Sequence, residues 1–211
     1  MSKKQIERRF IKPEFRVKTN DDGQKVIEGY SAVFDSSSEN LGWEDFEVRE
    51  YIQKDAFTKA LKGSDARALF NHDPNFVLGR ESAKTLILKQ DGRGLFSTII
   101  LPKTSFANDL AESIERGDIK EQSFGFIVGK DKWEEDREGK KATRTILEIK
   151  ELIDISPVTY PAYPDTDIAK RSYNAFTGAN TDKNIQDLEN KAQADDFDYE
   201  EIILQTEEIL I

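Results

Sequence analysis

The single histidine of the chain, His72, limits the chemistry that the protein can do. An imidazole that activates a nucleophile must be this one, and since the 211 residues include no cysteine, the nucleophile must be Ser or Thr. A histidine-rich zinc site is excluded, whereas a mixed site of one histidine and carboxylates is not. A lone histidine at a strand end is often structural, but the neighbours Asn71, Asp73 and Pro74 favour an exposed rim, where sites are commonly built.

Ser123 is the candidate nucleophile, in the segment Gln122-Ser123-Phe124-Gly125-Phe126. On a strand, alternation sends Phe124 and Phe126 to one face and Ser123 and Gly125 to the other. Two phenylalanines can hold the strand against a core, and the missing side chain of Gly125 would let a substrate backbone approach. Taken alone, the local pattern favours an ordinary strand serine. It lacks the Gly-x-Ser-x-Gly elbow of the α/β-hydrolases, which disfavours that family.

A serine–histidine pair also needs a group that holds the imidazole tautomer, usually a carboxylate. Asp154 is the best candidate, because Ile153 and Ile155 face one way on a strand and Asp154 faces the other. An exposed edge carboxylate is the alternative. Asp73 is adjacent to His72, but neighbours on an extended chain point apart. Glu148 and Glu151 are weaker rivals, and Arg80 and Arg144 are candidate side-chain helpers for the oxyanion.

The elements that must position these residues are mostly strands. Strands are predicted at residues 10–19, 25–34, 66–70, 85–89, 95–101, 122–128, 143–150 and 152–159. Helices are predicted at residues 54–61, with Asp55 as its cap, and 105–116, ended by Gly117. Pro74 is expected to stop pairing after His72, and residues 130–141 read as a charged loop. The fold class is therefore mainly β (α+β), an open sandwich or barrel with helical additions.

Charge divides the chain into a central domain and two tails. The formal net charge of -10 argues against bulk binding of nucleic acid, and no window approaches the roughly 20 apolar residues of a membrane span. No leader peptide is visible, and the lack of cysteine fits a reducing cytoplasm. We expect a basic tail at 1–12, a catalytic domain at 13–172 and an acidic appendage at 173–211. The appendage contains ten acidic residues and two basic ones.

Several segments together resemble the prohead (capsid-maturation) serine proteases of tailed bacteriophages. The order and spacing of these segments carry the resemblance, which covers roughly residues 28–170. They are Gly29-Tyr30-Ser31-Ala32-Val33-Phe34, Asp55-Ala56-Phe57, Asn71-His72-Asp73, Leu78-Gly79-Arg80, Asp91-x-x-Gly94-Leu95, Gln122-Ser123-Phe124-Gly125-Phe126, and Asp154-Ile155-Ser156-Pro157-Val158-Thr159-x-Pro161-Ala162-Tyr163-Pro164.

The resemblance implies an assemblin-like fold, as in the herpesvirus proteases, with a β-barrel core of short antiparallel strands and a few surrounding helices. It implies a serine endopeptidase that cleaves the scaffolding segment of the major capsid protein inside the immature capsid (the prohead) in the host cytoplasm, and that also cleaves itself. His72 would be the general base, Ser123 the nucleophile and Asp154 the acid, where many relatives carry Glu. No metal or organic cofactor, nucleic acid or membrane is implied. The portal protein and a second copy of the chain are further candidate partners.

Two other readings stay open from the residues. The first is a non-catalytic capsid-assembly or scaffold protein of the same fold, which a separation of more than about 8 Å between Ser123 and His72 would favour. The second is a hydrolase with a metal ion on His72, Asp73 and another carboxylate. Self-cleavage, if it occurs, is expected between about Ser172 and Ile202, where the chain is polar.

Overall fold

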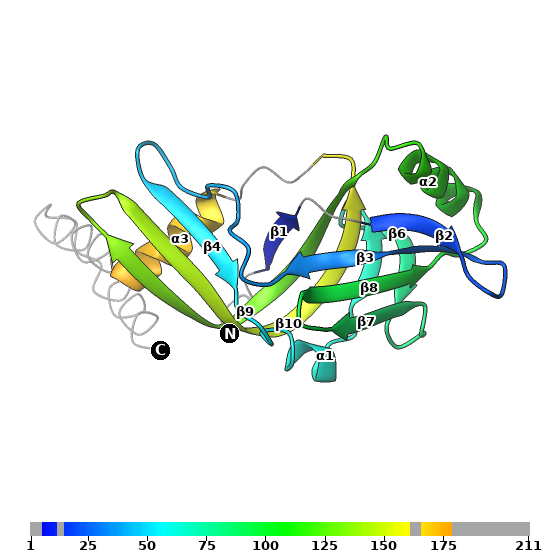
Figure 1. Ribbon diagram of the computed structural model, residues 1–211, viewed down its shortest axis with the longest axis horizontal. Helices are drawn as coiled ribbons and strands as arrows, with labels where there is room; N and C mark the ends of the chain where they lie inside the picture. Colours follow the sequence, from blue (N-terminus) through cyan, green and yellow to red (C-terminus); the bar gives the residue numbers. More distant parts are fainter. Residues whose placement is uncertain (1–5, 12–14, 161–165, 179–211) are drawn as a thin grey trace, which may run out of the picture. The chain divides into compact units, whose positions relative to one another are not determined.

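The computed structural model describes residues 6–11, 15–160 and 166–178, and most of these residues form strands (Figure 1). The contacts divide the chain into two compact units, Met1–Thr166 and Asp167–Ile211. Helix α3 (Thr166–Thr177) begins at that division, so the expected boundary at residue 172 falls inside it. The architecture of the first unit, which holds all the residues of the candidate site, confirms the predicted mainly β class.

The smaller sheet contains both predicted hairpins. Its four strands are antiparallel and lie in the order β2 (Phe15–Thr19), β3 (Lys25–Val33), β8 (Gly94–Ile100) and β7 (Leu86–Gln90). The β2–β3 turn ends with Gly23 at a φ of 74°, a conformation that glycine adopts without strain. Turn chemistry therefore located the two hairpin turns correctly.

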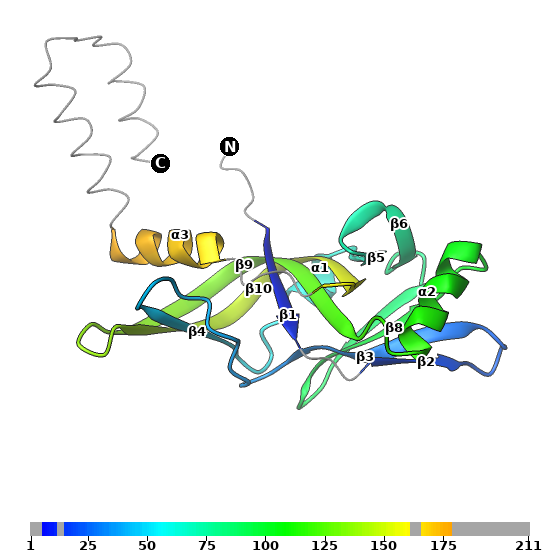
Figure 2. The same cartoon turned by 90° about the horizontal axis from the view of Figure 1, so that it is seen from above.

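The larger sheet carries the candidate catalytic residues. Its main path runs β1 (Glu7–Ile11), β9 (Glu121–Asp136), β10 (Lys141–Val158), β5 (Arg67–Phe70) and β6 (Asp73–Arg80). Strand β4 (Glu47–Ile52) pairs in parallel with one end of β10, and β5 pairs in parallel with the other end. Figures 1 and 2 show the long β9–β10 hairpin joining these two regions.

Four sequence expectations need correction here. The predicted strand 10–19 is two strands, β1 and β2, which belong to different sheets and are separated in sequence by Pro13, a residue with no N–H to donate. The predicted loop 130–141 is mostly paired strand, with a turn only at 137–140. Strand β4 was not predicted. Strand β6 begins directly after His72, and it accommodates Pro74 because β6 is the last strand of its sheet.

The predicted helix at 54–61 is also shifted. Helix α1 spans only Ala60–Gly63, and the residues before it form turns. Asp55 does not cap the helix. Its φ is 68°, and its carboxylate accepts a hydrogen bond from Gln90 Nε2 at 3.0 Å. Phe57 lies in these turns and Leu61 lies in the short helix, and both side chains pack onto the core.

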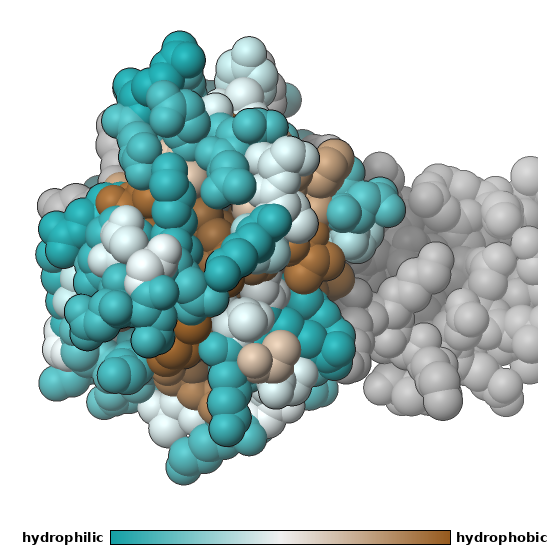
Figure 3. Space-filling view, turned by 90° about the vertical axis from the view of Figure 1, so that its right-hand side faces the viewer, coloured by the Kyte–Doolittle hydropathy of each residue, from teal (hydrophilic) through white to brown (hydrophobic). Residues whose placement is uncertain are grey.

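Helix α2 (Ser105–Glu115) matches the prediction. Thr104 caps its first turn by accepting from the Ala107 N–H at 3.3 Å, and Gly117, with a φ of 83°, follows its end. Its buried face consists of Ala107, Leu110, Ala111 and Ile114. The end of the domain that carries α2 shows apolar surface between polar side chains (Figure 3). Among the described residues, no helix is long and apolar enough to cross a membrane.

Candidate active site

A tight hairpin turn presents His72. Asn71 and His72 are the two residues between β5 and β6, and their φ angles are 53° and 57°. Two-residue hairpins of type I′ need a positive φ at both positions, a conformation that is uncommon for residues other than glycine, although Asn and His adopt it more often than most. Asn71 fixes the turn to the end of β10, because its N–H donates to Pro157 O at 3.0 Å and its Oδ1 accepts from the Thr159 N–H at 2.9 Å. A strained histidine held this firmly indicates a functional constraint.

Ser123 lies on β9, with a paired strand on each side. Its Cα partners are Ser156 on β10 and Phe10 on β1. As predicted, the rings of Phe124 and Phe126 lie in the core, where Phe124 contacts Phe57 at a centroid distance of 5.9 Å. The strand is therefore held rigidly and Ser123 projects from its opposite face. Its exposed fraction is 0%, so the side chain is fully covered.

The structure brings His72, Ser123 and Asp154 together. His72 Nε2 lies 2.8 Å from Ser123 Oγ, and His72 Nδ1 lies 2.5 Å from Asp154 Oδ2. Asp154 is buried on β10, and its Oδ2 also accepts a hydrogen bond from Ser156 Oγ at 2.7 Å. The imidazole thus bridges a hydroxyl and a carboxylate, with one ring nitrogen for each. The separation of more than about 8 Å that would favour a non-catalytic protein is not found.

This arrangement can support nucleophilic chemistry. A neutral imidazole that donates from Nδ1 to Asp154 leaves Nε2 as an acceptor for the hydroxyl proton of Ser123. The carboxylate then stabilises the imidazolium that forms. Ser156 was not identified from the sequence, although it stands two residues from Asp154 and therefore on the same strand face.

Gly125 has a role that the local sequence did not indicate. A Cβ at this position would lie closer than 3.0 Å to Asp154 Oδ1, and Asp154 is the cross-strand partner of Gly125. The missing side chain therefore makes room for the carboxylate of Asp154. An antiparallel neighbour determines this requirement, which is why inspection of the local segment did not reveal it.

The rival residues make other contacts. The Asp73 carboxylate accepts from the backbone N–H of Asn75 at 2.8 Å, and Glu148 accepts from Lys59 Nζ at 2.9 Å. Glu151 lies on β10 opposite Ile127. The expected oxyanion helpers are also engaged: Arg80 pairs with Asp65, and Arg144 lies in an ion network described below. Among the described residues, no three His, Asp or Glu side chains are grouped so that they could hold a metal ion.

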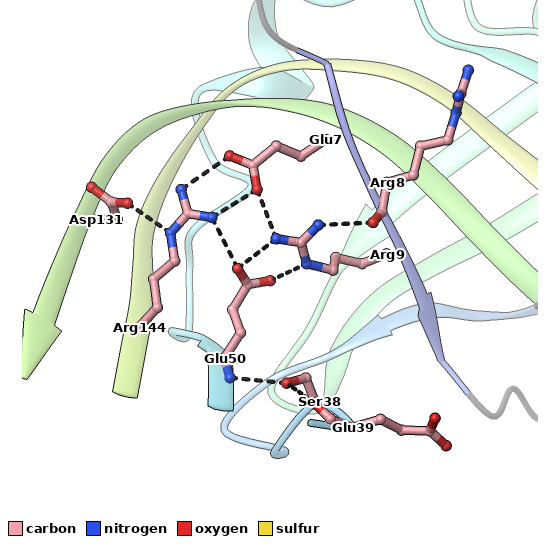
Figure 4. A network of polar contacts seen from close by, with 8 residues as sticks. All are labelled: Glu7, Arg8, Arg9, Ser38, Glu39, Glu50, Asp131 and Arg144. Carbon is pink, nitrogen blue, oxygen red and sulfur yellow. Dashed lines mark hydrogen bonds and ion pairs between the residues drawn. The ribbon is translucent and has the colours of Figure 1, made fainter. Parts of the chain in front are cut away.

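A buried ion network anchors β1, which falls within the stretch 1–12 that the sequence assigned to a tail. We call it the β1 network (Figure 4), and its members are Glu7 and Arg9 of β1, Glu50 of β4, Asp131 of β9 and Arg144 of β10. Arg144 Nη1 lies 2.7 Å from Glu7 Oε2, and Arg9 Nε lies 2.6 Å from Glu50 Oε1.

The charges of this network stabilise one another. Burial by itself raises the pKa of Glu7, but the hydrogen bonds and charges of Arg144 and Arg9 outweigh it and lower the pKa below its ordinary value. Burial opposes the charge of Arg144 too, yet Glu7, Glu50 and Asp131 raise its pKa. Glu7 and Arg144 therefore stay ionised at neutral pH, and β1 is attached by charge as well as by strand pairing.

Comparison with known proteins agrees with the motifs. The family model described as Caudovirus prohead serine protease matches residues 13–182. A solved structure of the bacteriophage T4 capsid assembly protease aligns with a TM-score of 0.47 and 14% sequence identity, covering 72% of this chain and 98% of that chain. Among curated proteins, none matches this chain.

Proposed function

Because the chain belongs to the caudovirus prohead serine protease family, which gives it a role as a capsid-maturation protease, we propose that it cleaves peptide bonds with Ser123, His72 and Asp154. The observation that supports this proposal most directly is the bridging position of His72, 2.8 Å from Ser123 Oγ and 2.5 Å from Asp154 Oδ2. His72 is also the sole histidine of the chain.

In the proposed reaction, Ser123 Oγ attacks the peptide carbonyl carbon while its proton moves to His72 Nε2. The tetrahedral intermediate collapses, the C–N bond breaks, and His72 Nε2 returns the proton to the leaving amine. Water then attacks the acyl-enzyme and gives a proton to His72. The ester C–O bond breaks, His72 returns that proton to Ser123 Oγ, and the carboxylic acid product leaves. Asp154 holds the Nδ1–H and stabilises the imidazolium in both halves of the reaction.

The proposed substrate is the scaffolding segment of the major capsid protein, cleaved inside the prohead within the host cell. Family membership supports this substrate class. Self-cleavage of the C-terminal segment and contact with the portal protein belong to the same proposal. The segment in which self-cleavage is expected, between about Ser172 and Ile202, lies largely outside the described residues.

Co-expression of the chain with candidate shell proteins, followed by mass spectrometry, tests this function. Ser123→Ala should abolish processing while leaving the fold intact, since it removes one hydroxyl, and the residual rate should be several orders of magnitude below wild type. Ser97→Ala is the matched control, because Ser97 is a buried strand serine bonded to Ser31 in the other sheet. Processing by a folded Ser123→Ala protein would refute the mechanism. Equal intact masses for wild type and Ser123→Ala would remove self-cleavage alone.

A further inference from the structure

At Ser123, strand β9 is paired on both of its edges. On one side, Ser123 pairs with Ser156 of β10, and on the other it pairs with Phe10 of β1. Extended peptides commonly bind proteins by adding a strand to a sheet edge, where main-chain hydrogen bonds supply affinity. A peptide that pairs with β9 at Ser123 must therefore replace one of these two neighbours.

Strand β10 cannot leave, because it carries Asp154 and pairs with β4, β5 and β9. Strand β1 can, because it is five residues long, lies at the edge of the sheet and precedes the rest of the domain in sequence. It also lies on the side of β9 away from His72 and Asp154, which both come from the β10 side. This is the side that remains for a substrate carbonyl to approach Ser123 Oγ.

Ile6, the residue just before β1, lies over the face of β9 that bears Ser123 and Gly125. The side chain of Ile6, just before β1, has its Cγ2 3.7 Å from the point that a Gly125 Cβ would occupy, beside the carboxylate of Asp154. Ile6 itself is 41% exposed, whereas Ser123 is fully covered. In this arrangement the nucleophile is formed but closed to a peptide.

The β1 network lets β1 detach without leaving an unpaired charge in the body of the domain (Figure 4). When Glu7 and Arg9 leave with β1, two ion pairs of Arg144 remain. Its Nε lies 2.7 Å from Asp131 Oδ2, and its Nη1 lies 3.1 Å from Glu50 Oε2. A buried charge stripped of its partners would cost several kcal/mol, and that cost is avoided here.

We propose that the edge of β9 now paired with β1 is the binding site for the scissile peptide, which adds to β9 as an antiparallel strand after displacing β1. The inference rests on the proposed function, since it assumes that Ser123 is the nucleophile. The N-terminal strand is then an internal occupant of the substrate site, and its release admits the scaffolding polypeptide.

A reversible covalent lock tests this inference in the full chain. The β1–β9 register, continued by one residue, places Ile6 opposite Ile127, so Ile6→Cys/Ile127→Cys should form a disulfide between neighbouring antiparallel strands. The natural chain has no cysteine, so no other disulfide can form. A fluorophosphonate that reacts with activated serines reports access to Ser123. The oxidised variant should label at least tenfold more slowly than the same variant reduced.

Matched variants complete the test. Thr19→Cys/Lys25→Cys locks the β2–β3 hairpin instead, where these residues are Cα partners, and should label equally when oxidised and reduced. Glu7→Gln should label at least tenfold faster than wild type, because β1 loses its charged contact with Arg144. Glu28→Gln removes a carboxylate bound to Lys18 and Arg16 in the other sheet and should not change the rate.

The outcomes separate the two proposals. Equal labelling of the oxidised and reduced Ile6→Cys/Ile127→Cys protein, abolished by Ser123→Ala, would overturn the inference while supporting the proposed function. A peptide would then approach over the face of the sheet with β1 in place. Failure of every variant to label, including Glu7→Gln, would overturn the proposed nucleophile and the inference with it. Slow labelling only in the oxidised β1 lock supports both.

Discussion

Replacing Gly125 by alanine should impair catalysis, although the three catalytic candidates Ser123, His72 and Asp154 are left unsubstituted. The new Cβ would lie closer than 3.0 Å to Asp154 Oδ1, whereas ordinary contacts begin at 3.4 Å. The carboxylate must therefore retreat by roughly 0.5–1 Å, and it cannot do so freely because it is buried and bonded to His72 and Ser156. A misplacement of about 1 Å in a catalytic group costs up to about 10²-fold in rate, so we expect a 10- to 100-fold loss in kcat/KM.

The assay is the initial rate of cleavage of the shell protein, compared with thermal unfolding of the same samples. Overpacking typically costs about 1–3 kcal/mol, which should lower the Tm without unfolding the protein. Gly129→Ala is the matched control on the same strand, since its Cβ would lie 2.6 Å from Glu148 Oε1. The Glu148 carboxylate is not part of the candidate site, and its ion-pair partner, Lys59, lies on the surface. Full activity in Gly125→Ala, or an equal loss in both variants, would refute the role assigned to the position of Asp154.

Two further predictions concern charge and proton transfer. His72→Ala should cost as much activity as Ser123→Ala. Asp154→Asn should lower the cleavage activity by a comparable factor or less, up to about 10⁴-fold, because the amide favours the wrong imidazole tautomer. If Asp154→Asn were active and Asp73→Asn were inactive, Asp73 would replace Asp154 as the third catalytic residue. The lowered pKa of Glu7 means that its contribution to stability is complete above its ordinary value of 4.5 and is lost as the pH falls through its folded value. Urea unfolding between about pH 5 and pH 3 should therefore show a shallower loss of unfolding free energy for Glu7→Gln than for wild type, and an unchanged slope would argue against an anchoring role of Glu7.

The sequence located the elements whose signals are local. The Asn20–Gly23 turn and the capped, amphipathic helix α2 are each specified by residues that are close together in the chain. His72 was identified by its uniqueness, and the roles of Ser123 and Asp154 came from a family resemblance. The short distances between these side chains then agreed with that assignment.

What the sequence did not reveal depends on distant partners. In β4 the buried residues are Val48, Glu50 and Ile52, at every second position. Because the middle one is charged, the strand lacks the alternation of apolar and polar residues by which a strand is predicted. Glu50 is buried because Arg9 and Arg144 meet it, and Glu7 and Arg144 are 137 positions apart. No local pattern distinguishes such a charge from a solvated one. Gly125 illustrates the same limit, since its requirement is set by Asp154 on another strand.

The pairing of β10 with β5 has a kinetic consequence for the candidate site. These strands are parallel, with Asp154 opposite Arg67, and His72 and Asp154 are separated by 82 positions in the chain. Contacts of such long range form slowly, because the intervening chain loses conformational entropy before the contact contributes favourable free energy. The imidazole therefore meets its carboxylate only after synthesis has passed β10 and the larger sheet has assembled. A partly made or partly folded chain therefore lacks the contact between His72 and Asp154, so folding itself would delay the activity proposed for this site.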